Sequence, residues 1–129
     1  MGAWQDPYQT PTVAVLLSGL GPDARGAADG VIERLGRKPK PAWITPWGWA
    51  LCVARPEPEG PVFFVPDPER PRIAARVPRA VFNDHAPRLS RSAREAIVHA
   101  SCVGDGVWVE WAAASTAVLE PVFAMIDPR

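Results

Sequence analysis

The chain has 129 residues, of which 47% are hydrophobic and 22% charged, and its formal net charge is zero. This length suits one domain, and the composition is that of a globular chain rather than a disordered one. No uninterrupted apolar run approaches the roughly 20 residues that a membrane span needs. Residues 1–10 lack the basic start and apolar stretch of a secretory signal, so we expect a cytoplasmic protein without a membrane anchor.

Two residue types are unusually frequent. The chain holds 16 Pro and 6 Trp, and Pro normally makes up only about 5% of a protein. Because proline cannot donate to a β-ladder, we expect most of these residues at strand ends and edges. Residues 1–11 form an irregular N-terminal arm in this interpretation, and residues 12–129 form a single domain.

The first third of the chain predicts one strand and one helix. Residues 12–17 (TVAVLL) are apolar on both faces, which is typical of a central strand. A helix is expected over 22–35, with Pro22 in its first turn and Gly36 as its C-terminal stop. Within this helix Gly26 and Gly30 lie four residues apart, so we expect close packing of the helix on the sheet.

The middle of the chain predicts three short strands after a basic connector at residues 37–46. These strands cover 49–55, 62–65 and 72–77, with turns between them. The last of the three alternates: Ile73, Ala75 and Val77 lie on one face, and Arg72 and Arg76 on the other. We expect an antiparallel meander.

The final third predicts a loop over 78–89, a helix over 92–103 and a strand over 107–111. Ser92 and Glu95 have the spacing of a capping box for that helix. In the strand, Trp108 and Glu110 share the face opposite Val107, Val109 and Trp111. Residues 115–126 fit either a strand interrupted at Pro121 or a short helix that starts at Glu120 and Pro121, and we favour the strand.

The resulting order is β-α-β-β-β-α-β, followed by the ambiguous element. Runs of strands between two helices are typical of the α+β class. We therefore predict one α+β domain whose mostly antiparallel or mixed sheet of five to six strands carries two main helices.

The leading functional hypothesis concerns the tryptophans. Tryptophan is enriched at interface hot spots, although these side chains could equally fill a core made of small residues. The residues proposed for an aromatic contact surface with an arginine rim are Trp43, Trp47, Trp49, Trp108, Arg72, Arg76 and Arg79. We expect a non-catalytic domain that binds another protein, most simply a second copy of itself, and we expect no cofactor.

An alternative hypothesis places an anionic ligand at the loop formed by Ser18, Gly19 and Gly21. Glycines before a helix expose backbone N–H groups that suit a phosphate or carboxylate. His85 or His99 would then act as acid or base, as in a small enzyme or ligand-binding protein. A plain tight turn explains the glycines as well, and Glu95 and His99 also have the spacing of an ordinary helix surface pair.

The neutral total charge hides charged blocks. Residues 70–94 contain seven arginines and one acid, whereas 56–69 and 95–129 are acidic. Nucleic-acid binding would normally need a chain that is basic overall, so we expect these arginines to pair with the acidic blocks. Cys52 and Cys102 are expected to be reduced and buried, with no metal site, because too few ligands accompany them.

Overall fold

The computed structural model describes residues 5–45, 47–55 and 60–127, so residues 1–4 of the expected N-terminal arm lie outside the described part. The described strands form one antiparallel sheet in the order β1-β2-β3-β4-β6-β5. The strands are β1 (Lys40–Ile44), β2 (Gly48–Val53), β3 (Val62–Val65), β4 (Arg72–Pro78), β5 (Ile97–Val103) and β6 (Gly106–Ala112). The helices are α1 (Val13–Ser18), α2 (Pro22–Leu35), α3 (Arg79–His85), α4 (Arg91–Ala96) and α5 (Leu119–Ile126), with 3-10 turns η2 (Ala86–Arg88) and η3 (Thr116–Val118). The predicted α+β class, with a sheet of five to six strands, is confirmed.

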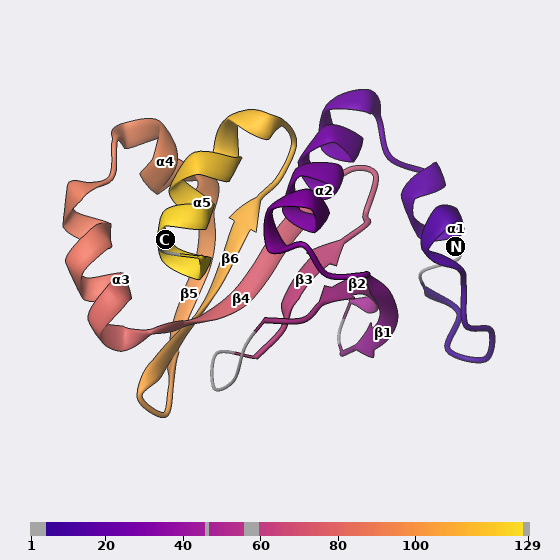
Figure 1. Cartoon of the computed structure of the whole chain (residues 1–129), viewed down its shortest axis with the longest axis horizontal. Coiled ribbons are helices and arrows are strands. Elements are labelled where there is room, and N and C mark those ends of the chain that lie inside the picture. The colour runs from indigo at the N-terminus through magenta and orange to yellow at the C-terminus, as the bar shows by residue number, and fades with distance from the viewer. Residues whose placement is uncertain (1–4, 46, 56–59, 128–129) are drawn as a thin grey trace.

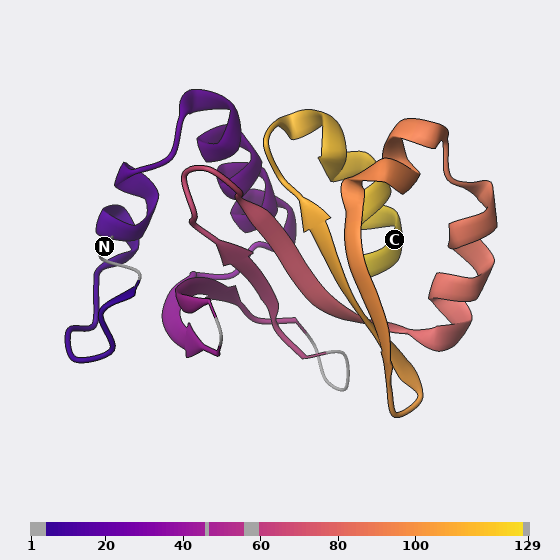
Figure 2. The ribbon, with the colours of Figure 1, turned by 180° about the vertical axis from the view of Figure 1, so that it is seen from behind.

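The two faces of the sheet have different surroundings. Helices α2 and α5 lie over one face (Figure 1), while the view from behind shows no described helix across the other (Figure 2). The covered face is apolar because strand residues alternate between the two sides. Its buried side chains are Leu51, Val53, Val62, Phe64, Ile73, Ala75, Val77, Val107, Val109 and Trp111.

Helix α2 begins and ends as predicted. Pro22 occupies its first turn, and Gly36 caps its C-terminus with a φ of 64°, a left-handed conformation that glycine adopts without strain. The two internal glycines allow a close approach, but to the C-terminal segment rather than to the sheet. A Cβ at Gly30 would lie 2.5 Å from Leu119 Cδ1, and one at Gly26 would lie 3.3 Å from Thr116 Cγ2.

The first predicted strand is wrong: residues 13–18 form helix α1. The Thr12 hydroxyl accepts a hydrogen bond from the Val15 amide at 3.1 Å and caps the helix. Only Leu16 and Leu17 are buried along it. A short apolar run fits a strand or a buried helical turn equally well, and here the cap favours the helix.

The predicted helix over 92–103 is also wrong. Helix α4 ends at Ala96, and β5 follows at once. The N-cap is Ser90, whose hydroxyl accepts from the Ala93 amide, so Ser92 does not cap the helix. The helix gives way to a strand because Gly104 and Asp105 form a two-residue hairpin turn that pairs β5 with β6.

Three smaller corrections concern the connections. The expected basic connector contains β1, which pairs with β2, and the expected loop after Pro78 contains α3, whose Val81 and Phe82 pack against the core. At the C-terminus, residues 116–126 are helical instead of the favoured strand. The Ser115 hydroxyl accepts from the Ala117 amide at the start of η3, and α5 then buries Val122 on the sheet.

Arg55 joins three parts of the chain. Its guanidinium donates to the carbonyl oxygens of Gly60 at 2.7 Å, Arg76 at 2.8 Å and Ile126 at 3.1 Å. The residue is buried, so these hydrogen bonds replace the water that the charge has lost. Arg55 thereby links the end of β2 to β4 and to the C-terminus of α5.

Candidate binding surface on the bare face

The side of the sheet that no described helix covers, which we call the bare face, carries a row of residues across five strands. The strand register aligns Cys52, Phe63, Ala74, Glu110 and His99 in that order. The side chain of Ala74 on β4 is a single methyl group. It therefore leaves room for the Phe63 ring of β3 and the Trp108 ring of β6 to meet above it.

An aromatic cluster fills that space. The Trp108 ring lies 6.3 Å from the Trp47 ring, centroid to centroid, with the two planes 24° apart. It also lies 6.1 Å from the Phe63 ring. All three residues are half-buried. Because no described helix covers them, each exposes part of its ring to solvent.

Two charged groups hold the aromatic cluster in place. The Glu110 carboxylate accepts from the Trp108 indole at 3.1 Å and from the Arg72 guanidinium at 3.0 Å. Arg72 in turn lies over the Trp47 ring, 6.0 Å from its centroid, a cation–π arrangement. Because both oxygens of a nearly buried carboxylate are engaged, the rings and the arginine form one fixed unit.

Arg76 extends this unit toward the β5–β6 hairpin. Its guanidinium passes over Gly106, where a Cβ would lie 2.5 Å from Cζ. The same guanidinium pairs with Asp105 at 3.2 Å. Gly106 is therefore needed for the close approach of the arginine.

The four tryptophans proposed for one contact surface lie on different sides of the sheet. Trp47 and Trp108 belong to the bare face, with Arg72 and Arg76. Trp43 and Trp49 pack edge to face on the other side, 5.6 Å apart, where the Trp49 indole donates to the Asp6 carbonyl at 2.7 Å.

Arg79 lies outside the aromatic cluster as well. It begins α3 and donates to the Gly104 carbonyl at 2.7 Å. Sequence reasoning also missed one member of the cluster, Phe63. All four residues of β3 are apolar, so their pattern gives no indication of which face each one occupies.

Among the described residues, six of the seven arginines in 70–94 have a side-chain partner, and three of them pair with the acidic block at 95–129 as expected. Ion pairs join Arg72 to Glu110, Arg76 to Asp105, Arg88 to Asp84 and Arg91 to Glu95. Arg94 donates to the Leu89 carbonyl. Four of these arginines are thus paired with carboxylates of the chain. The segment therefore offers less positive charge to an anionic partner than its sequence indicated.

The residues of the anionic-ligand hypothesis are not brought together. Ser18 ends α1, with its hydroxyl on the Val15 carbonyl, and Gly21 caps α2, so two helices flank the loop where a strand and a helix were expected. His85 ends α3, at the opposite end of the molecule from α1 (Figure 1). His99 lies on β5, so the helix surface pair that the spacing of Glu95 and His99 allows does not form.

The two cysteines are both unpaired but differ in exposure. Cys52 is half-buried on the bare face, and burial raises the pKa of its thiol, with a smaller opposing effect from Lys40 on the neighbouring strand. Cys102 is exposed on β5, so the prediction that it is buried is wrong. The prediction assumed a helix packed against the core, whereas Cys102 lies on the edge strand β5, outside the core.

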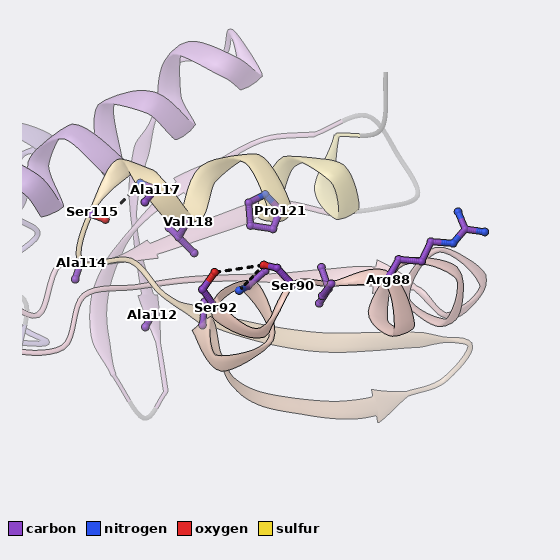
Figure 3. Close-up of a pocket in the computed structure, with 12 residues that line it drawn as sticks. Arg88, Ser90, Ser92, Ala112, Ala114, Ser115, Ala117, Val118 and Pro121 are labelled. Atoms are coloured by element: carbon purple, nitrogen blue, oxygen red, sulfur yellow. Dashed lines mark hydrogen bonds between the residues drawn. The ribbon is translucent and has the colours of Figure 1, made fainter.

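A cavity of about 420 Å³ lies between α4 and the start of α5 (Figure 3). It is lined mainly by alanines and serines: Arg88, Leu89, Ser90, Ser92, Ala93, Ala96, Ala112, Ala114, Ser115, Ala117, Val118 and Pro121. The Ser90 and Ser115 hydroxyls cap α4 and η3. The lining contains one ionisable side chain, Arg88, which offers no acid–base pair for catalysis.

Comparison of the chain with protein-family models, curated proteins and solved structures finds no significant match. Within residues 5–45, 47–55 and 60–127, no helix is long and apolar enough to cross a membrane. The same part of the chain has no group of three or more His, Cys, Asp or Glu side chains placed to hold a metal ion. The functional argument therefore depends on the geometry of this chain alone.

Proposed function

We propose that this chain is a cytoplasmic, non-catalytic assembly domain that binds a second copy of itself through the bare face. The observation that supports this is the aromatic cluster of Trp47, Phe63 and Trp108. Tryptophan and arginine dominate interface hot spots because they bring large contact areas with a polar handle. Here the Trp108 indole and the Arg72 guanidinium are already paired with Glu110, so association would remove aromatic surface from water without separating these two groups from their partner.

The dimensions of the sheet are compatible with such an interface. Six strands about 4.8 Å apart, each about six residues long, cover roughly 29 by 20 Å, so two such faces would bury on the order of 1,100 Å². A specific interface needs roughly 1,000 Å². Two sheets that face each other across a two-fold axis would form an isologous contact, the commonest arrangement in homo-oligomers.

Sedimentation velocity over a range of protein concentrations tests the proposal, with two tryptophan variants as a matched pair. Trp108→Ala removes the centre of the aromatic cluster and is expected to weaken association by about tenfold or more, as for a hot-spot residue. Trp43→Ala removes a tryptophan that is 41% exposed on the other side of the sheet and is expected to leave association unchanged. A monomeric wild type at high concentration, or equal losses in the two variants, would contradict the proposal.

A further inference from the structure

The two edges of the sheet are unequally protected against pairing with another strand. Strand β1 has five residues, including Lys40 and Pro41, and α1 lies beside that end of the sheet (Figure 1). Lysine, proline and short length are the usual means by which an edge strand avoids another chain. Strand β5 has seven residues with no Lys, Arg, Asp, Glu or Pro among them.

The β5 edge is also open to solvent. Five of its seven residues are exposed, and the side chains of Val98 and Val103 are 52% and 53% exposed. The strand has one irregularity, a bulge at Val98, which leaves His99–Val103 as a regular segment. An uncharged, exposed edge of this kind presents a row of backbone groups that another strand can pair with.

The hairpin turn determines which backbone groups point outward. Gly104 has a φ of 61°, and it is followed by Asp105, whose φ is not positive, as in a type II′ turn. Val103 and Gly106, which flank this two-residue turn, form a hydrogen-bonded pair, and the ladder then alternates. Ser101 therefore directs its N–H and C=O toward β6, whereas Ala100 and Cys102 direct theirs away from the sheet.

We propose that β5 pairs in antiparallel fashion with β5 of a second copy, on a two-fold axis through Ser101. The regular segment is centred on this residue, so the register is self-complementary. Ala100 faces Cys102 of the partner subunit, and the outward N–H and C=O groups of both become paired. His99 faces Val103 of the partner subunit, and no like charges meet within the segment.

The serine at the axis favours this arrangement. Ser101 faces Ser101 of the partner subunit as a pair without backbone hydrogen bonds, in which the side chains come close enough for one hydroxyl to donate to the other. A two-fold axis perpendicular to the sheet keeps both bare faces on the same side of a continuous twelve-stranded sheet. This edge contact rests on the proposed self-association and adds to it, because two such dimers stacked face to face form a tetramer with D2 symmetry.

Disulfide trapping tests the register. In a Cys102→Ser background, Ser101→Cys places two thiols across the axis with Cα atoms about 4.5 Å apart, within the range that a disulfide spans. Ala100→Cys in the same background is the control, because its two thiols lie diagonally, about 7–8 Å apart at Cα. We expect Ser101→Cys to form disulfide dimers about tenfold faster or more under mild oxidation. Equal rates, or faster trapping of Ala100→Cys, would overturn the proposal.

Oligomer size separates the edge contact from the face contact. Ala100→Pro removes an N–H that points away from β6, so it blocks pairing at the edge and leaves the β5–β6 hydrogen bonds in place. Ala100 lies opposite Val109, on the side of the sheet away from the aromatic cluster, and Ala100→Ser, which keeps the N–H, is the control. We expect a wild-type tetramer at high concentration and a dimer in both Ala100→Pro and Trp108→Ala. If Ala100→Pro has the wild-type size, the edge proposal fails and the face proposal is untouched. If Ala100→Pro alone dissociates a wild-type dimer, the face proposal fails and the edge proposal stands.

Discussion

The two faces of the sheet use the same residue type in opposite ways. Trp108 and Trp111 lie three residues apart on β6 and therefore point to opposite sides. Trp111 is 1% exposed beneath the helices, whereas Trp108 is half-buried on the bare face and donates to Glu110. The covered face thus gains stability from burial alone, while the bare face holds its aromatic rings in a fixed position with charged partners.

This difference is also visible in the neighbours of each tryptophan. Around Trp111 the residues are apolar side chains of β4, β5 and the helices. Around Trp108 they are two aromatic rings, Arg72 and Glu110. If the bare face served only to cover the core, it would not need the nearly buried ion pair of Arg72 and Glu110. Apolar residues of similar volume stabilise a fold at least as well.

The largest effect is expected from Trp111→Ala. Removing this fully buried ring leaves a cavity in the core and should lower the free energy of unfolding by about 3–5 kcal/mol. Trp108→Ala should lower it by no more than about 2 kcal/mol, because its ring is only half-buried. Urea denaturation at low protein concentration measures both values. Equal losses would show that the bare face is as much a part of the core as the covered one.

A smaller loss is expected from Arg55→Met. The substitution keeps the length of the side chain but leaves three carbonyl groups without their donor, at a cost of about 2–4 kcal/mol. Arg25→Met is the matched control, since Arg25 forms only an exposed pair with Asp29. Thermal and urea unfolding should show a change within about 0.5 kcal/mol for that control. A similar change in both variants would contradict the anchoring role of Arg55.

The smallest effect is a difference in thiol reactivity, and it requires no substitution. Burial raises the pKa of Cys52, so this thiol holds less thiolate at pH 8 than an ordinary one and should react with iodoacetamide more slowly than exposed Cys102. Mass spectrometry of the labelled protein measures the two rates. If the bare faces associate, labelling of Cys52 should slow further as protein concentration rises, and Trp108→Ala should remove that dependence. A Cys52 rate that does not change with concentration would argue against burial of the bare face in the oligomer.

The pH dependence of stability follows from the same shift. Because the folded pKa of Cys52 lies above the unfolded value, the folded state keeps its proton longer as the pH rises. The contribution to stability is therefore complete at pH values below the pKa of the thiol in the unfolded chain, and it is lost as the pH rises through the raised folded pKa.

Several elements could be predicted because their patterns are local. The alternation in β4 placed Ile73, Ala75 and Val77 on one side and Arg72 and Arg76 on the other, and the structure confirms it. The boundaries of α2 follow from Pro22 and Gly36. The shared face of Trp108 and Glu110 follows from the two-residue period of β6 and is confirmed by their hydrogen bond.

The errors fall where a local pattern allows two structures. Residues 12–17 have no polar alternation, so the run was compatible with a strand, and the Thr12 cap made it a helix. Ala93, Ile97 and Ala100 have helical spacing, yet β5 forms from Ile97 onward because its hydrogen bonds go to β6. Helical spacing of a few apolar residues is a weak signal compared with the ladder that this hairpin forms.

The sequence by itself determined the α+β class, the antiparallel meander and the main N-terminal helix. These features depend on periods, turns and caps formed by residues close together in the chain. Only the tertiary structure decided which arginines meet which acids, which sheet face no described helix covers, which tryptophans share that face and which edge lies open. Trp47, Phe63 and Trp108 are far apart along the chain, and they meet because the sheet inserts β6 between β4 and β5. Strand order depends on the summed contacts of the whole core, so no single segment of the sequence contains it.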